Sequence, residues 1–272
     1  MFLVERTQTR IRKEGEQMKL LRPIAPMILA LAISPASHAV AADSAAAEAS
    51  TTVLDLNDVR KNPGNYQWFD FKPNLKKLIL SGAADTQHVS ILWYTIANGS
   101  VGLHYHAKTE SVYTIDGSQA DVKGVYPTGS LYFNPPGSGH AIKDSSGFFV
   151  LAYASPPDFG KTALIGEYTP VQIDTNAPDF EKKYPFKEKE PGVRIYAVPL
   201  DPQGGMSSEF IDLSAHPYEY KGNYLLVTKG NCIIDGKAYG KGMLVVAKAV
   251  KPQPFRIAAA KDGACLALGV SF

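Results

Sequence analysis

The chain has little cysteine: its 272 residues include two, Cys232 and Cys265, which lie far apart in the sequence. A metal site made of closely paired cysteines is therefore excluded. The sequence also lacks the serine, histidine and acid series of a nucleophilic triad, and it has no glycine-rich loop for phosphate. Any chemistry in this chain has to come from other groups.

Long apolar runs are absent as well. The most apolar stretch, residues 24–33, has about ten residues and includes a proline, which is too short to span a bilayer. It follows the basic segment Met18–Arg22 and precedes small residues at Ser37–Ala42, an order typical of a secretory signal peptide. We therefore expect residues 1–41 to be a signal peptide with an over-extended N-terminus, the true start being at Met18.

Removal of this segment changes the charge of the chain. The formal charge of +2 becomes −1, because six basic and three acidic residues precede a cut near Ala39 to Ala42. No basic patch remains that would indicate binding to nucleic acid or to an anionic membrane. The mature protein is expected to be secreted or periplasmic, with residues 42–50 as a flexible lead-in.

Long helical periodicity is also missing, and short β-rich runs separated by turn signals dominate the mature chain. This pattern predicts an all-β fold, and the number of runs suits two barrels. The expected strands are Leu75–Leu80, Val89–Ile96, Ser111–Ile115, Leu131–Phe133, Phe148–Ala154, Arg194–Val198, Glu209–Leu213, Tyr224–Thr228, Cys232–Ile234, Met243–Ala247, Phe255–Ala259 and Cys265–Val270.

Histidines are few, six in all, yet His104 and His106 stand one residue apart. On a strand both imidazoles point to the same face, where one divalent metal can take both. Glu110 follows four residues later, and His140 comes at a glycine-rich corner that a closed barrel would bring back to the pair. Nitrogen and oxygen ligands of this kind suit Zn, Fe, Ni, Cu or Mn rather than Ca or Mg.

The same stretch closely resembles the two signature motifs of the cupin superfamily. The first motif is matched by His104, His106, Glu110 and Gly117, and the second by Gly129, Pro135, Gly137 and His140. The resemblance implies a jelly-roll barrel in which His104, His106, Glu110 and His140 are the metal ligands. Two positions depart from the pattern: Gly99 stands one residue closer to the first histidine than usual, and Asp144 replaces the closing asparagine.

An internal repeat predicts a second barrel. Residues 111–117 and 129–133 are answered by residues 224–230 and 242–246, both at an offset of 113. The same offset places the four ligands on Pro217, Glu219, Asn223 and Gln253, so the second barrel has lost the metal site. The chain resembles a bicupin with a metal-binding barrel at 51–155, a linker strap at 156–192 and a degenerate barrel at 193–272.

The leading interpretation is a secreted metalloenzyme, dioxygenase-like or a hydrolase or isomerase, acting on a small molecule. Glu110 is the candidate catalytic base, and His88, Lys143 and Asp144 are further polar groups that could reach the mouth of the barrel, although each is expected at the surface. One divalent transition metal is the expected cofactor.

Other readings stay open. The resemblance also extends to the zinc-binding cupin of a bacterial anti-sigma factor and to secreted paired-cupin proteins of unknown function, which favours a non-catalytic binding or sensor protein. A metal-free sugar-binding barrel is the third reading. Edge strands allow a homodimer, and the sequence leaves it even whether Cys232 and Cys265 form a disulfide.

Overall fold

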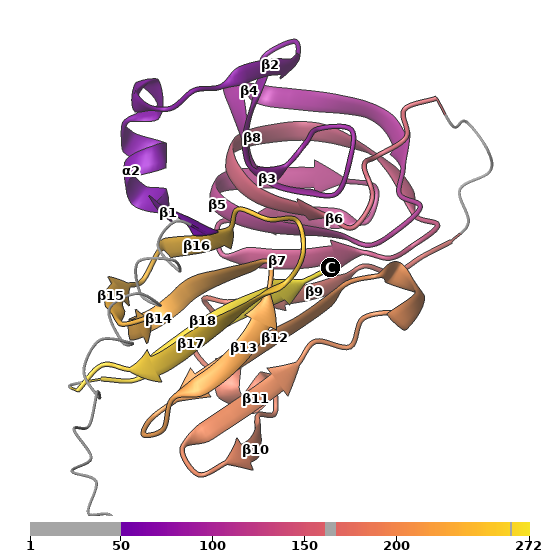
Figure 1. The fold of residues 1–272 in the computed structure, drawn as a ribbon. Coiled ribbons are helices and arrows are strands. Elements are labelled where there is room, and N and C mark those ends of the chain that lie inside the picture. The colour runs from indigo at the N-terminus through magenta and orange to yellow at the C-terminus, as the bar shows by residue number, and fades with distance from the viewer. Residues whose placement is uncertain (1–49, 161–166, 262) are drawn as a thin grey trace, which may run out of the picture. The chain divides into compact units, whose positions relative to one another are not determined.

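A computed structural model describes residues 50–160, 167–261 and 263–272. The expected signal peptide at 1–41 and almost all of the lead-in at 42–50 lie outside the described residues. The described chain is all-β, as predicted, and forms two antiparallel sheets of eight and ten strands (Figure 1). Within this part of the chain, no helix is long and apolar enough to cross a membrane.

The first sheet curls into the first jelly-roll barrel. Its strands are β2 (Phe69–Lys72), β3 (Leu75–Gly82), β4 (His88–Tyr105), β5 (Glu110–Asp121), β6 (Gly124–Pro127), β7 (Ser130–Asn134), β8 (Gly139–Tyr153) and β9 (Val171–Asp174). The long strands β4 and β8 pair over most of their length, with register shifts from Tyr94 onward that bend both of them. Gly99 lies at this bend because a Cβ there would collide with the ring of Tyr94.

The second sheet forms the second barrel. Its strands are β1 (Thr51–Asp55), β10 (Lys187–Glu190), β11 (Val193–Ala197), β12 (Ser207–Leu213), β13 (Tyr218–Gly222), β14 (Tyr224–Ile234), β15 (Lys237–Gly240), β16 (Met243–Ala247), β17 (Gln253–Ala259) and β18 (Cys265–Ser271). Cys232 on β14 and Cys265 on β18 form a disulfide. The helical elements are short: α2 (Leu56–Lys61), α3 (Phe180–Lys183) and the 3-10 turns η1 (Pro63–Asn65) and η2 (Pro202–Gly204).

Strand alternation builds one core inside each barrel and one between them. On β4, Leu92 points into the first barrel, whereas Ile91 belongs to a core that also contains Phe210, Leu226 and Leu268 of the second barrel. Successive side chains of a strand face opposite sides of the sheet, so an apolar residue at every position is satisfied only when both faces are covered. The two barrels therefore share a hydrophobic core.

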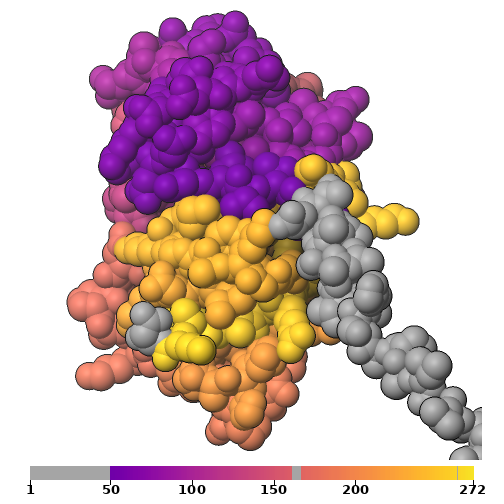
Figure 2. All heavy atoms as spheres, turned by 60° about the vertical axis from the view of Figure 1, so that its left-hand side comes forward, coloured from indigo at the N-terminus to yellow at the C-terminus, as the bar shows by residue number. Residues whose placement is uncertain are grey.

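The N-terminal strand joins the second barrel, although the expected boundary at 51 assigns it to the first. Residues of β1 pair with β16 from Thr51 opposite Ala247 to Asp55 opposite Met243. Leu54 and Leu56 enter the shared core. Figure 2 shows the indigo start of the described chain lying directly against the orange atoms of the second barrel. The strand β1, which precedes the first barrel in the sequence, thus links the two barrels.

The linker at 156–192 packs against both barrels. Its strand β9 pairs with β7 of the first barrel. Phe180 is buried, and its ring centroid lies 5.0 Å from that of Phe210 on β12. The charged run Lys187–Glu190, which is absent from the expected strands, forms the strand β10. It pairs with β11 and exposes all four side chains. An edge strand can be exposed on both faces, and its charges discourage further pairing.

Candidate metal centre

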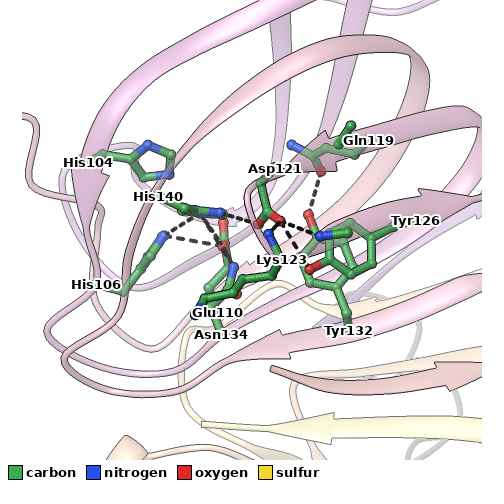
Figure 3. Close-up of polar contacts among 12 residues, drawn as sticks. His104, His106, Glu110, Gln119, Asp121, Lys123, Tyr126, Tyr132, Asn134 and His140 are labelled. Carbon is green, nitrogen blue, oxygen red and sulfur yellow. Dashed lines mark hydrogen bonds and ion pairs between the residues drawn. The ribbon is translucent and has the colours of Figure 1, made fainter. Parts of the chain in front are cut away.

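Strand register brings the four predicted ligands together. His104 near the end of β4 lies opposite His140 on β8, and Glu110 at the start of β5 lies opposite Tyr153 on β8. His106 follows β4 directly, and its backbone is held by a hydrogen bond from its N–H to the Ser138 carbonyl, 2.8 Å. All four side chains are at least 96% buried. Figure 3 shows them converging from three segments of the first barrel.

Three imidazoles gather at one point, and the Glu110 carboxylate lies beside two of them, those of His106 and His140. The ligand atoms of His104, His106 and His140 all lie within 4.8 Å of one another. His106 Nε2 is 3.2 Å from both His140 Nε2 and Glu110 Oε2. Among the described residues, these three histidines are the only group of histidine, cysteine and acidic side chains close enough to hold a metal ion.

Hydrogen bonds fix which nitrogen of each ring is available. His104 Nδ1 is 2.9 Å from the Gly102 carbonyl. A carbonyl oxygen only accepts, so the ring proton lies on Nδ1 and Nε2 keeps its lone pair. His140 Nδ1 is 2.8 Å from Asp121 Oδ2 in the same arrangement. Both rings therefore present an unprotonated Nε2 when neutral, as metal-bound histidines do when their other nitrogen donates to an oxygen.

Asp121 is a residue that the sequence reasoning missed. Its side chain is fully buried. While Oδ2 accepts from His140, Oδ1 accepts from the backbone N–H groups of Lys123, 2.7 Å, and Gly124, 3.1 Å. These bonds lock the carboxylate, which in turn sets the angle of the His140 ring. The only local signal was a turn of Asp and Gly at the end of a strand, which predicts the turn and not the contact with His140.

The electrostatics favour a cation at this point. Burial lowers the pKa of His106 to about 4 and also lowers the pKa of His104, so both rings are neutral at pH 7. Burial opposes ionisation of Glu110, but the neighbouring His106 and His140 hold its pKa well below the usual range. Burial likewise opposes charge on His140, but Asp121 and Glu110 raise its pKa to about 9. A metal at Nε2 would take the place of that proton.

The donor set fits a divalent transition metal. Three imidazoles that can be neutral and one ionised carboxylate are mixed nitrogen and oxygen ligands of the kind that such metals accept. Two buried polar atoms beside them, His106 Nδ1 and Asn134 Oδ1, have no hydrogen-bond partner. Asn134 also donates from Nδ2 to Glu110 Oε2 at 2.8 Å. An incomplete set of hydrogen bonds in a buried polar cluster is unusual in a finished core.

An apolar cavity lies beside the ligands. It has about 20 Å³ of room for the centre of a water molecule, which is enough for roughly one water. Its lining, apart from three of the ligands, consists of Phe71, Leu92, Val101, Gln119, Ile142, Leu151, Tyr153, Pro157 and Phe159. Three aromatic residues, Phe71, Tyr153 and Phe159, thus face the site.

The other polar residues considered from the sequence lie in different places. Lys143 and Asp144 are exposed, as expected. His88, also expected at the surface, is fully buried, because its ring packs 4.7 Å from the ring of Tyr153 and its Nε2 contacts Lys77 Nζ at 3.3 Å. Lys77 was not singled out, since a lysine between apolar strand residues is ordinarily exposed.

The second barrel holds no counterpart of this centre in its described residues. Pro217 and Glu219 are exposed. Asn223 is buried but used structurally: it donates to the Val250 carbonyl and accepts from the Phe272 N–H at 2.7 Å. The ring of Tyr220 lies against Gly222 and Gly269, where any Cβ would collide with it. An aromatic ring thus fills the interior of this barrel.

Comparison with known proteins agrees with this architecture. Residues 56–154 match the family model of the ChrR cupin-like domain. No curated protein matches the chain. A provisionally assigned dioxygenase from Nostoc punctiforme has a similar structure, with 12% identity, a TM-score of 0.53 and 82% of each chain covered. A deletion mutant of Bacillus subtilis oxalate decarboxylase gives 14% identity and a TM-score of 0.47, covering 82% of this chain and 77% of that one. At these identities, such similarity concerns the fold alone.

The fold and the site together define a protein of two jelly-roll barrels with one three-histidine candidate metal centre. Residues 56–154 are a cupin domain by this match, and the chain as a whole has the fold of two cupin barrels in tandem.

Proposed function

We propose that this bicupin is an exported metalloenzyme that binds one divalent transition metal through His104, His106, Glu110 and His140 and acts on a small molecule. The observation that carries the proposal is the convergence of three buried imidazoles and an ionised carboxylate beside an apolar cavity. Four protein ligands leave coordination positions free on a metal that prefers five or six.

The bound metal would supply Lewis acidity to a coordinated oxygen. The residues of the chain have separate tasks. Asp121 and the Gly102 carbonyl hold the His140 and His104 rings in the orientation for binding. Tyr153, Phe71 and Phe159 keep bulk water from the cavity. Glu110 is the candidate base when its carboxylate leaves the metal, because it lines the cavity. The reaction would be an oxygenation, a hydrolysis or an isomerisation, since the fold alone does not choose among them.

Export is part of the proposal. It is supported by the signal-like order of residues 18–42 and by the Cys232–Cys265 disulfide, since disulfides persist mainly in oxidising compartments.

A second candidate is a non-catalytic metal-binding or sensor protein. Two observations favour it: the match of residues 56–154 to the ChrR cupin-like domain, and a cavity with little room beyond a single water.

Elemental analysis by mass spectrometry tests the metal site. The mature protein should be purified without a histidine tag, beside the double variant His104→Ala, His106→Ala and the control His216→Ala, whose histidine is exposed. We expect about one transition-metal ion per chain in wild type and control, and loss in the double variant. Equal metal content in all three after metal supplementation contradicts the site. Metal-dependent oxygen uptake with candidate substrates, absent in Glu110→Gln, then separates the enzyme from the sensor.

A further inference from the structure

Lys77 on β3 is a buried lysine beside the candidate metal centre. Its side chain is 1% exposed, and Nζ lies 4.2 Å from the ring centroid of Phe71 and 4.9 Å from that of Tyr153. Both rings line the cavity. The ammonium group is thus one aromatic ring behind the cavity wall, within the range at which a charge acts in a low-dielectric interior.

The only hydrogen-bond partner that Lys77 Nζ has among the described residues is a neutral ring. His88 Nδ1 is 2.7 Å from the Thr86 carbonyl, which fixes the proton on Nδ1. His88 Nε2 therefore accepts from Lys77 Nζ at 3.3 Å. Within the described part of the chain, no carboxylate comes within 4.0 Å of this ammonium group.

A buried cation without an anion is costly, and an apolar residue in its place would usually stabilise the fold. Burial lowers the pKa of Lys77 to about 8, and Glu110 partly offsets this effect. The side chain is therefore still mostly charged at pH 7. A costly buried charge beside a binding cavity indicates a role in the site.

A second lysine stands nearer the surface on the same aromatic rings. Lys72 is exposed, and its Nζ lies 4.1 Å from the ring centroid of Phe159 and 5.7 Å from that of Phe71. It also acts on a ligand: the pKa of His104 is lowered chiefly by burial and to a lesser degree by the Lys72 charge. The exposed Lys72 and the buried Lys77 therefore both lie over the Phe71 ring, one nearer the surface and one in the interior.

The charges of the site, once metal is bound, leave a positive excess. A divalent ion and the two buried carboxylates, Glu110 and Asp121, sum to zero, while the three histidines are neutral ligands. Lys77 then adds one uncompensated positive charge in the interior. A bound anion would compensate it, whereas a neutral ligand would not.

We propose that the ligand of the first barrel is a small carboxylate, an inference that rests on the proposed metal site. Lys77 is the counter-charge of this ligand behind the Phe71 and Tyr153 rings. Lys72 attracts the ligand to the cavity. The cavity has room for roughly one water, so the ligand is restricted to the smallest carboxylates, which would displace that water.

Binding of acetate and of its neutral isostere acetamide tests this proposal. The Co²⁺-loaded protein should be titrated with each compound by calorimetry and by the visible absorption of cobalt. Wild type is expected to bind acetate at least tenfold more tightly than acetamide. Lys77→Met is expected to weaken acetate binding roughly tenfold, because a charge in the low-dielectric interior is lost one aromatic ring away from the anion. Cobalt content and acetamide binding should stay unchanged in the variant.

Lys76→Met is the matched control. Lys76 is the next residue on β3, but its Nζ points outward and pairs with Asp70 Oδ1 at 2.7 Å. We expect it to bind acetate like wild type. Lys72→Met should slow acetate association and reduce its dependence on salt. Equal acetate affinity in wild type and Lys77→Met, or equal affinity of wild type for acetate and acetamide, overturns the proposal.

Failure of the metal site is distinguishable from failure of this inference. If the protein takes up no cobalt, the proposed function fails, and the same titrations are then run on metal-free protein, followed by line broadening of ¹³C-acetate in magnetic resonance. Acetate binding that Lys77→Met weakens would still support the anion site. No acetate binding by metal-free wild type in that case would reject it.

Discussion

The substitution Asp121→Asn is the most informative single change in the candidate metal centre. Asparagine has the shape of aspartate, and its carbonyl oxygen can keep the hydrogen bonds from the backbone N–H groups of Lys123 and Gly124. Its amide then faces His140 Nδ1, where the wild-type Oδ2 accepts at 2.8 Å. Two N–H donors would point at each other, so His140 must move its proton to Nε2, the atom that would bind the metal.

The size of the effect follows from this single contact. A hydrogen bond to a charged acceptor contributes roughly 1.5–3 kcal/mol, and loss of such a partner to a metal-binding histidine typically costs about 10- to 100-fold in metal affinity. The expected loss is therefore on the order of 10- to 100-fold. The metal-free variant should also unfold more easily, by roughly 1.5–3 kcal/mol, because the same buried hydrogen bond to His140 is lost while the bonds that hold the turn survive.

Competition for Zn²⁺ against a chromophoric chelator measures this loss. Asp144→Asn is the matched control: Asp144 is exposed and has a left-handed backbone with φ of 49°, which asparagine tolerates. It should leave the affinity unchanged. A zinc affinity of Asp121→Asn within twofold of wild type would refute the reasoning, because His140 would then need no oriented partner.

Two further predictions concern stability. Folding lowers the pKa of Lys77 from 10.5 to about 8, so between these pH values the unfolded chain holds more protons than the folded one. The free energy of unfolding should therefore rise from pH 8 to 10, by up to roughly 3 kcal/mol, in wild type and not in Lys77→Met. Urea titrations at each pH measure this difference. An equal rise in both proteins would mean that Lys77 is not the group responsible. Replacing both Cys232 and Cys265 with alanine should lower the free energy of unfolding by roughly 3–4 kcal/mol, because the disulfide closes a separation of 33 residues. Zinc affinity should stay unchanged, because both residues lie in the second barrel. A loss of zinc affinity would contradict the view that the disulfide stabilises the fold without supporting the metal centre.

Much of the fold could be predicted because alternation and turn signals are local. All twelve expected strands overlap observed strands, Tyr224–Thr228 and Cys232–Ile234 being parts of one, β14, but β5 continues to Asp121 and β8 already begins at Gly139. The sequence underestimated β4, which continues through the exposed residues 95–98 to Tyr105. Exposure on both faces at that bend removes the pattern on which a strand prediction depends. Strand β10 was missed for the same reason, since its residues are all charged.

The four predicted ligands could be placed together because the stretch resembles the two cupin motifs, and the resemblance implies that they share one metal. Their supporting residues could not. Asp121 approaches His140 only because β5 pairs with β8, with Ala120 opposite Lys143. Lys77 reaches the cavity through the pairing of β3 with β4, where it lies opposite Leu92. Such contacts join residues at no fixed spacing, and Lys77 also breaks the rule that lysines lie at the surface.

The second barrel has no metal site of its own but supports the metal centre of the first barrel. The loop between His106 and Glu110 leans on it: Thr109 N–H donates to the Gly204 carbonyl at 3.0 Å, and Lys108 Nζ to the Gln203 carbonyl at 2.9 Å. Gly204 has no side chain at the point where a Cβ would collide with Thr109. Because a ligand displaced by about 1 Å loses much of its function, the turn η2 that fixes this loop supports the centre. The shared core covers the outward apolar residues of β4, such as Ile91, that a lone first barrel would expose to water. The absence of metal ligands from the second barrel therefore leaves the first metal centre intact, whereas removal of the whole second barrel would remove the support of that centre.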